Sequence, residues 1–443
     1  MTISDIRGHL LTGASARSLP HYETAVRQLN LFVGDPVASV DAAIAESPDF
    51  VMAHAARAYL HLLGTEPAGI PVAYEAFERA SRIAASEREV AHLTAISCLV
   101  NGRWQKASRV LEDIAIQHPH DLLALQAGHQ VDFFRGDSRM LRDRIARALP
   151  AWSSEVPGYH AVLGMHAFGL EEMGQYAKAE RSGREAVELE PRDSWAQHAV
   201  AHVLEMQGRQ HDGIKWMQGN TEGWSRDNFF AVHNWWHLAL YHLDLGDVDT
   251  VLALFDGPIY GARSRVILDM VDASAMLWRL HLRGIDVGDR WEAVADGWEP
   301  VAEQSIYAFN DAHAMMAFVG ARRPAAAQRL LAAQREAMMA EHSDNASFTR
   351  EVGHPVALAI QAFGEGRYGE TARQLRAVRN IAHRFGGSHA QRDVLDLTLV
   401  EAALRAGQQA LAQALSAERA AVKPHSPLAR LFLERANAMK QAA

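Results

Sequence analysis

The stretches GRWQKASRVLEDIAIQHP (residues 102–119) and GQYAKAERSGREAVELEP (residues 174–191) decide the fold of this chain. In both, glycine comes first, an aromatic residue follows two positions later, alanine is sixth and proline is eighteenth. Glycine permits a tight turn, the small alanine lets two helices approach closely, and proline ends the second helix. One spacing used twice therefore predicts a repeated unit of two helices joined by a tight turn.

The predicted unit recurs along most of the 443 residues. Ala, Leu, Glu, Gln and Arg repeat at three- and four-residue spacing and β-branched runs of period two are almost absent, so we expect nearly all helix. A period of about 34 residues is typical of paired-helix repeats, in which each unit buries its apolar face only against its neighbours. The pattern resembles the tetratricopeptide repeat. The expected turn glycines are Gly102, Gly136, Gly174, Gly208, Gly246, Gly284, Gly320, Gly366 and Gly407.

Four longer stretches are more specific than a generic repeat: HAVAHVLEMQGR (198–209), HNWWHLALYHL (233–243), GHPVALAIQAFGEGRY (353–368) and GGSHAQRDV (386–394). Together they resemble the tetratricopeptide-repeat-protein-38-like family, and the resemblance covers most of the chain. It implies a stand-alone helical repeat protein without a settled biochemical role. The resemblance therefore says more about the fold than about the function.

We expect residues 1–443 to form one all-α superhelix, a right-handed α-solenoid of helix pairs that could close around a central cavity. No linker rich in Pro, Gly and Ser divides the chain. The best candidate breaks are Gly257-Pro258 and the polar stretch 341–350. A subdivision would give N-terminal repeats over residues 1–257 and C-terminal repeats with longer helices over residues 258–443.

Composition narrows the classes of partner. A net charge of -9 argues against binding to nucleic acid or to an anionic membrane, because those surfaces require clustered excess cation. No apolar run approaches the 18 or so residues needed to cross a bilayer. The single cysteine, Cys98, leaves no intramolecular disulfide and no zinc cluster built on cysteine, which suggests a reducing compartment, most simply the cytoplasm. The 23 histidines are unusually many and are not gathered in a tag.

The first candidate site residues lie around residue 200. In the tetratricopeptide repeat, four positions of the first helix line the concave surface. If Gly208 is the turn glycine, the resemblance puts Trp195, His198, His202 and Glu205 at those positions. Their spacing of three, four and three residues independently places them on one stripe of a helix.

Further candidates lie on other predicted helices. His233 and His237 form a second pair with helical spacing, although the register turns only His233 clearly inward. In GGSHAQRDV, Ser388 and Gln391 form a capping-box pattern, so an imidazole and a guanidinium would lie at a helix N-terminus, a favourable place for an anion. The ligand-binding candidates outside the first stripe are His233, His237, Asp269, Asn310, Asp311, His313, His389, Arg392 and Asp393, with Asp272 and Asp396 nearby on the same helices.

Two interpretations of the histidine pairs remain open. Imidazoles at positions i and i+4 can chelate one zinc ion, and a third ligand from a neighbouring helix would leave a coordination position for water. Neither pair has the His-Glu-x-x-His form, because Ala-Val-Ala and Asn-Trp-Trp lie between the histidines. The alternative is a structural role, in which each histidine is a hydrogen-bonded spacer between helices. A divalent metal is thus a candidate cofactor, and its identity is left open.

Two functions are compatible with these residues. The first is a binding scaffold that grips a small or peptidic polar ligand in a His-rich concave pocket. The second is an enzyme of the hydrolase or lyase type, in which His198 or His202 is the general base, Glu205 orients it, and Arg392 or a metal stabilises developing negative charge. No nucleotide-binding loop or serine nucleophile motif is present.

Overall fold

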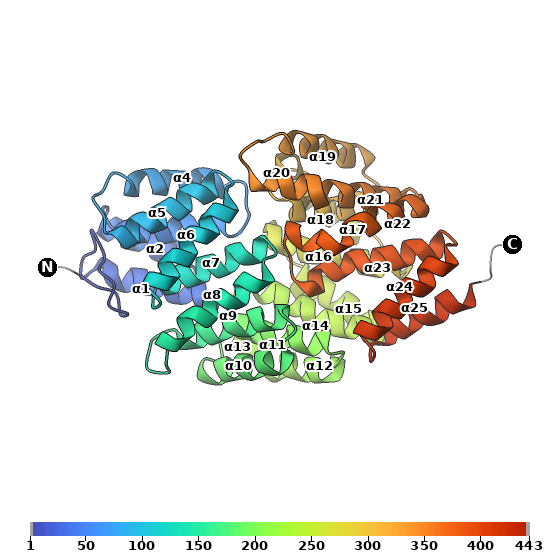
Figure 1. Ribbon diagram of the computed structural model, residues 1–443, viewed down its shortest axis with the longest axis horizontal. Coiled ribbons are helices and arrows are strands. Elements are labelled where there is room, and N and C mark those ends of the chain that lie inside the picture. The colour runs from blue at the N-terminus through green and yellow to red at the C-terminus, as the bar shows by residue number, and fades with distance from the viewer. Residues whose placement is uncertain (1–2, 440–443) are drawn as a thin grey trace. The chain divides into compact units, whose positions relative to one another are not determined.

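The computed structural model describes residues 3–439, and their regular structure is helical apart from two isolated β-bridges (Figure 1). The prediction of an all-α chain is confirmed. The α-helices are α1 (Ser18–Leu31), α2 (Pro36–Glu46), α3 (Val51–Leu62), α4 (Gly69–Ala80), α5 (Glu87–Val100), α6 (Trp104–Gln117), α7 (Leu122–Phe134), α8 (Ser138–Ala148), α9 (Tyr159–Glu172), α10 (Tyr176–Leu189), α11 (Ser194–Met206), α12 (Gln210–Gly219), α13 (Thr221–Ser225), α14 (Ala231–Leu245), α15 (Val248–Leu254), α16 (Ile267–Leu282), α17 (Arg290–Trp298), α18 (Ala308–Gly320), α19 (Pro324–Ala337), α20 (Asp344–Phe348), α21 (His354–Gly364), α22 (Tyr368–Val378), α23 (His389–Arg405), α24 (Gln409–Val422) and α25 (Pro427–Ala438).

The helices pack as sequential pairs, as the repeat pattern predicts. Helix α9 packs against α8 and α10, and α21 packs against α22. Gly102 (φ 68°) and Gly174 (φ 70°) are both in the left-handed region, where a residue with a side chain is strained. The alanine of each motif is fully buried, and each motif proline comes two residues after the end of the second helix. The four positions of the motif therefore have the roles that their spacing indicates.

One predicted turn glycine is wrong. Gly320 is the last residue of α18, and the left-handed residue of that turn is Arg322, with φ of 54°. A Cβ atom at Gly320 would lie 2.3 Å from the indole ring of Trp291. Glycine occupies this position because α17 approaches it closely. Since the left-handed residue is Arg322 and not Gly320, the repeat register is shifted by two residues here.

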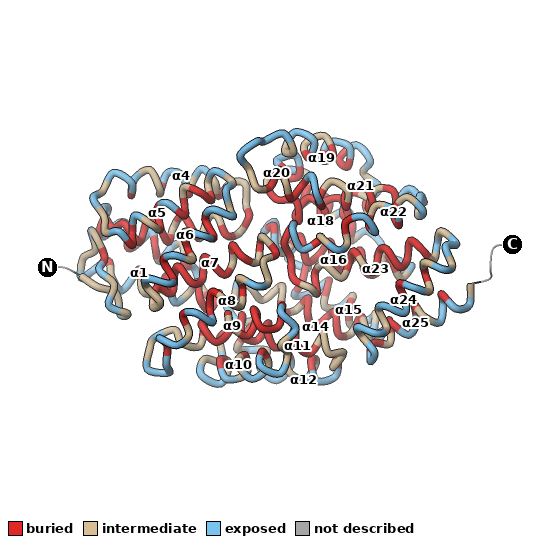
Figure 2. Tube along the Cα trace, viewed as in Figure 1, coloured by how far each residue is buried: buried red, intermediate tan, exposed pale blue. Residues whose placement is uncertain are grey.

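Contacts divide the chain into two compact units. The first unit contains residues up to 200 together with residues 220–231 and 342–344, and the second contains residues 201–219, 232–341 and 345 onward. The chain passes from the first unit to the second within α11, whereas Gly257-Pro258 lies inside the second unit. Figure 2 shows that buried residues follow the inner sides of the helix pairs.

A buried ion pair holds three helices of the first unit together. Arg144 of α8 donates from Nε to Asp132 Oδ2 of α7 at 2.8 Å and from Nη2 to the Ser108 carbonyl of α6 at 3.0 Å. Both charged side chains are excluded from solvent. A Cβ atom at Gly128 would lie 2.7 Å from the guanidinium, so the absence of a side chain there makes room for it. This arrangement satisfies two charges that would otherwise be costly to bury.

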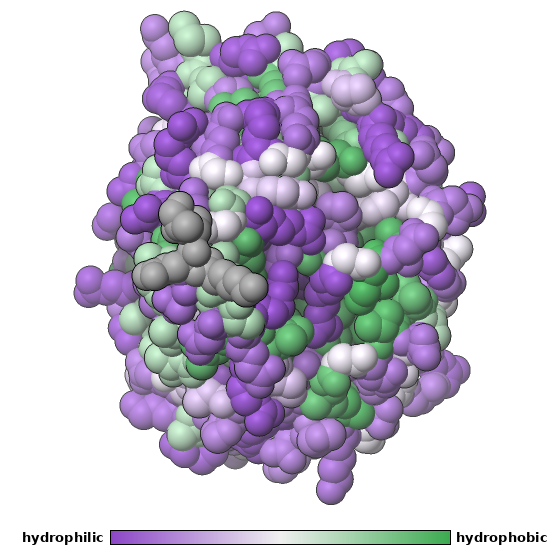
Figure 3. Space-filling view, turned by 90° about the vertical axis from the view of Figure 1, so that its right-hand side faces the viewer, coloured by the Kyte–Doolittle hydropathy of each residue, from purple (hydrophilic) through white to green (hydrophobic). Residues whose placement is uncertain are grey.

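On the face shown in Figure 3, hydrophilic side chains surround smaller groups of hydrophobic ones. Among the described residues, no helix is long and apolar enough to cross a membrane.

Candidate functional site

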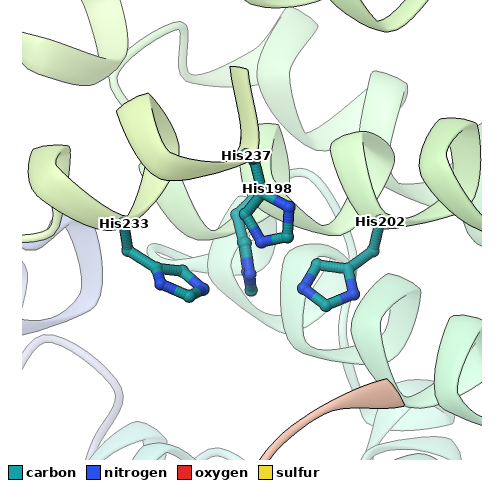
Figure 4. Close-up of side chains that lie close together, drawn as sticks. All are labelled: His198, His202, His233 and His237. Carbon is teal, nitrogen blue, oxygen red and sulfur yellow. The ribbon is translucent and has the colours of Figure 1, made fainter. Parts of the chain in front are cut away.

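The second unit contains a cluster of three histidines. His202 comes from α11, and His233 and His237 come from successive turns of α14. Their candidate ligand nitrogens lie within 4.8 Å of one another. The ring centroid of His237 is 4.4 Å from that of His202 and 4.8 Å from that of His233. Figure 4 shows these three imidazoles turned toward one another, with His198 one turn earlier on α11.

Carboxylates orient two of the three rings. His233 Nδ1 lies 2.8 Å from Asp272 Oδ2, and His237 Nδ1 lies 3.3 Å from Glu205 Oε2. A carboxylate accepts the hydrogen bond, so Nδ1 carries the proton and Nε2 is the nitrogen with the lone pair. The same arrangement orients histidine ligands in metal sites and makes them more basic.

Burial keeps part of the cluster uncharged. Burial, together with the neighbouring His237 ring, lowers the pKa of His202 well below its ordinary value. Burial, with His233 and Arg279 nearby, does the same for the pKa of His237. Both rings are therefore neutral at physiological pH, which is the form that can bind a metal ion.

A tryptophan and an arginine extend the cluster. Trp236 stacks on His233, with ring centroids 5.3 Å apart and an interplanar angle of 13°. The guanidinium carbon of Arg279, from α16, lies 5.1 Å from the centroid of a Trp236 ring. Arg279 is 4 % exposed and donates to the main-chain carbonyls of Ala275 at 3.2 Å and Ala390 at 2.7 Å. A cation is thus buried next to the imidazoles.

A small cavity of about 40 Å³ lies beside the cluster, within the second unit. Glu205 and Arg279 belong both to its lining and to the surroundings of the histidines. Its other charged lining residues are Asp244, Asp393, Arg419 and Lys423. Such a volume has room for about three water molecules.

The predicted group at the start of α23 forms a local cap and an ion pair. The capping box is present, because Gln391 N donates to Ser388 Oγ and Ser388 N donates to Gln391 Oε1. His389 is the first residue of the helix and half-buried. Arg392 folds back to donate to the carbonyl of Gly387. Its guanidinium therefore binds the main chain of its own loop.

Asp393, one residue further along α23, pairs with a cation of α24. It accepts two hydrogen bonds from Arg419, at 2.7 and 2.9 Å. Burial raises the pKa of Asp393, but Arg419 and Lys423 outweigh burial and hold it below the ordinary range. The carboxylate therefore stays ionised, and Arg419 neutralises it.

The predicted group on α18 makes short-range contacts. Asp311 accepts from Ser305 Oγ at 2.5 Å and from Gln334 Nε2 at 3.3 Å, and burial raises its pKa to about 7. His313 Nδ1 donates to the Phe309 carbonyl at 2.8 Å, and burial lowers the pKa of His313 to about 4. Asn310 beside them is 5 % exposed. Asp311 and His313 are hydrogen-bonded within the core.

Asp272, of the two aspartates on α16, is the more deeply buried and meets a histidine. Asp269 lies one turn earlier on α16 and is only half-buried, whereas Asp272 is 2 % exposed and bonds His233. Only the rotation of α16 about its axis separates their environments.

Trp195 and His198 belong to the first unit, where they are surrounded by aromatic side chains. The His198 ring stacks on Phe168 with centroids 5.4 Å apart and lies 4.9 Å from Trp195 and 5.1 Å from Phe230. His129 packs edge-on against Trp195 at 5.6 Å, and burial lowers the pKa of His129 to about 3. The predicted stripe of α11 therefore changes character along its length, from aromatic surroundings at Trp195 and His198 to imidazoles and carboxylates at His202 and Glu205.

Arg279 was not among the residues predicted from the sequence. It is the only arginine or lysine in ILDMVDASAMLWRLHL, an otherwise largely apolar helix. A lone cation in such a helix is a signal for burial, because Arg is seldom fully buried without a purpose.

No protein-family model matches this sequence. Among solved structures, a human IFIT1 dimer with m7Gppp-AAAA is similar at 14% sequence identity and a TM-score of 0.37, covering 95% of both chains. A monomeric IFIT1 mutant with Gppp-AAAA has 14% identity and a TM-score of 0.33, covering 95% of this chain and 100% of the other. These values are too low to carry ligand or mechanism from those proteins to this one.

Proposed function

We propose that this helical repeat protein binds a divalent transition-metal ion through His202, His233 and His237, and that a small polar ligand binds at this centre. The observation that supports the proposal is the pair of hydrogen bonds from His233 to Asp272 and from His237 to Glu205. Both bonds use Nδ1, so Nε2 is the nitrogen through which each ring would bind the metal. This is the orientation in which a carboxylate holds a metal-binding imidazole.

The donor set fits a borderline metal. Imidazole suits zinc, copper, iron and nickel, whereas magnesium and calcium prefer oxygen ligands. Three histidines with one open position form a common catalytic zinc arrangement. The depressed pKa values of His202 and His237 support it further, because protons compete weakly for these nitrogens.

An enzyme of the hydrolase type is the second candidate function. A metal in such a site polarises a carbonyl group or lowers the pKa of a bound water. Glu205 lies beside His237, and the buried guanidinium of Arg279 adds a positive charge close to the rings. The net charge of -9 favours a small polar substrate over nucleic acid for either function.

We also propose that the chain is related to the tetratricopeptide-repeat-protein-38-like family. The stretches at 198–209 and 233–243 that suggest it contain all three proposed ligands. If the kinship holds, the cluster is a property to look for in other members.

The direct test is metal analysis of the purified protein. We expect one zinc, iron, copper or nickel ion per chain, or stoichiometric uptake of zinc after treatment with a chelator. The variant His202→Gln with His237→Gln should lose the metal, while His242→Gln should keep it. His242 is the matched control because it also lies on α14 and bonds a carboxylate, Asp247 Oδ2 at 2.9 Å. A protein that neither contains nor takes up a metal would overturn the proposal.

A further inference from the structure

The turn that follows α15 forms a cleft with the start of α17. The cleft has a volume of about 300 Å³, and all of its lining residues belong to the second unit. Phe255 and Tyr260 line it with aromatic side chains that are 3 % and 4 % exposed. Small-molecule sites have volumes of about 300–1,000 Å³, so this cleft has room for a small organic molecule. Its charged lining residues are Asp256, Arg263, Asp289 and Arg290.

Two of these four charges neutralise each other. Arg290 donates from Nε to Asp256 Oδ1 at 2.7 Å and from Nη2 to Asp256 Oδ2 at 2.6 Å. Its third nitrogen, Nη1, donates to the carbonyl of Val287 at 2.9 Å. A fork of two parallel hydrogen bonds fixes both side chains in one position. The pair of Asp256 and Arg290 is therefore a neutral part of the cleft wall.

Arg263 and Asp289 carry the other two charges. Within residues 3–439, neither side chain forms a hydrogen bond or an ion pair, although the two have opposite charges and line the same cleft. Both residues are exposed, so each charge is hydrated and can exchange water for a ligand. The cleft thus presents one cation and one anion that are separated by more than ion-pair distance.

The main chain of Arg263 is in a costly conformation. Its φ of 49° is in the left-handed region, which glycine adopts freely and arginine does not. A hydrogen bond from its main-chain nitrogen to the carbonyl of Tyr260, at 2.9 Å, holds the turn. A Cβ atom at Gly261 would lie 2.2 Å from the main-chain oxygen of Asp256, so the turn is also tightly packed. Strained residues of this kind cluster at ligand-binding sites.

We propose that this cleft binds a small zwitterion, an amino acid with an apolar side chain, whose carboxylate binds Arg263 and whose ammonium group binds Asp289. A ligand with one charge is attracted by one of these residues and repelled by the other, whereas a zwitterion is attracted by both. A guanidinium offers parallel donors to a carboxylate, and an ammonium group offers three donors to Asp289. The apolar side chain contacts Phe255 and Tyr260. No histidine lines this cleft, so the inference is independent of the proposed metal centre.

The test is calorimetric titration of the full-length protein with L-leucine at neutral pH and low ionic strength. We expect saturable binding by the wild type. Two analogues of the same shape each lack one charge: leucinamide lacks the carboxylate, and 4-methylpentanoate lacks the ammonium group. Each analogue should bind at least fivefold more weakly than leucine, because it loses one attraction and keeps one repulsion.

Variants assign each charge of the ligand to its residue. Arg263→Gln should weaken leucine binding at least fivefold without weakening leucinamide, which has no carboxylate to lose. Asp289→Asn should weaken leucine to a similar extent without weakening 4-methylpentanoate. Arg265→Gln is the matched control, since Arg265 is also exposed and lies two residues after Arg263 but does not line the cleft. It should bind leucine within twofold of the wild type.

Several outcomes would overturn the inference. One is a wild type that does not bind leucine, and another is a pair of variants, Arg263→Gln and Asp289→Asn, that bind it as tightly as the wild type. Either analogue binding as tightly as leucine would refute recognition of a zwitterion. Equal weakening by Arg265→Gln would assign the effect to surface charge in general. Circular dichroism of each variant shows that the fold is kept, and none of these outcomes bears on the metal centre.

Discussion

Replacing Asp272 by asparagine tests the histidine centre with the smallest change in shape. Asp272 is 2 % exposed, and its two oxygens lie 2.8 and 3.0 Å from His233 Nδ1. Asparagine has the same volume and can still accept the hydrogen bond through its one carbonyl oxygen. The substitution therefore removes the negative charge beside the imidazole of His233 and leaves the ring in place.

The expected loss is 10- to 100-fold in zinc affinity, the usual effect of losing a carboxylate that orients a metal-binding histidine. This corresponds to about 1.4–2.8 kcal/mol of binding free energy. The lower end applies if the amide oxygen takes over the hydrogen bond, and the upper end applies if the amide turns its NH₂ group toward Nδ1. His233→Gln should cost more, because it removes a proposed ligand and leaves the buried carboxylate of Asp272 without this partner.

The assay is competition with a chromophoric zinc chelator at pH 7.5, with thermal unfolding measured in parallel. Asp269→Asn is the matched control, since Asp269 lies one turn earlier on the same helix and is only half-buried. Zinc affinity of Asp272→Asn within twofold of the wild type, in a variant that remains folded, would refute the argument that this carboxylate supports a metal ligand.

Three further predictions concern stability. Asp132→Ala should lower the free energy of unfolding by about 3–5 kcal/mol in urea titrations, because it leaves the guanidinium of Arg144 buried and unpaired; the double variant with Arg144→Met should recover much of this loss. Burial raises the pKa of Asp311 to about 7 in the folded state, whereas the aspartate of the unfolded chain has a pKa of about 4. Between pH 4 and 7 the folded state therefore keeps a proton that the unfolded state has released, and the free energy of unfolding falls as pH rises. Asp311→Asn should therefore gain roughly 3 kcal/mol over the wild type between pH 4 and 7, and a constant difference across this range would contradict the shift. Gly320→Ala should cost about 1–3 kcal/mol by thermal unfolding, because its methyl group would overlap an indole ring, and a neutral result would show that the ring moves freely.

The helix pairs could be predicted because their signals are local. The glycine, alanine and proline of residues 102–119 act within a few residues of their own positions, so their spacing is enough to place a turn and the ends of two helices. Gly320 shows the limit of this reasoning. Glycine is needed both for a left-handed turn and for close approach by a neighbour, and the sequence does not distinguish these causes, whereas the packed Trp291 ring does.

The candidate site was only partly predictable. Helical spacing alone predicted that His202 shares a helix face with Glu205, and His233 with His237. These residues do lie together in the second unit. Spacing also suggested Asp311 and His313, which bond to near neighbours in their own helix layer. A polar residue in an amphipathic helix shows which face it occupies, but not which partner it meets.

The sequence by itself determined the helices, their pairing and the stripes on which the histidines lie, because these depend on the 3.6-residue period and on turn residues close along the chain. Only the tertiary structure decided that Asp272 orients His233, and that Arg279 is buried with no carboxylate of residues 3–439 at ion-pair distance. Those outcomes depend on the rotation of α16 against α14 and α23. That rotation results from the packing of many side chains distant in sequence, so no single motif records it.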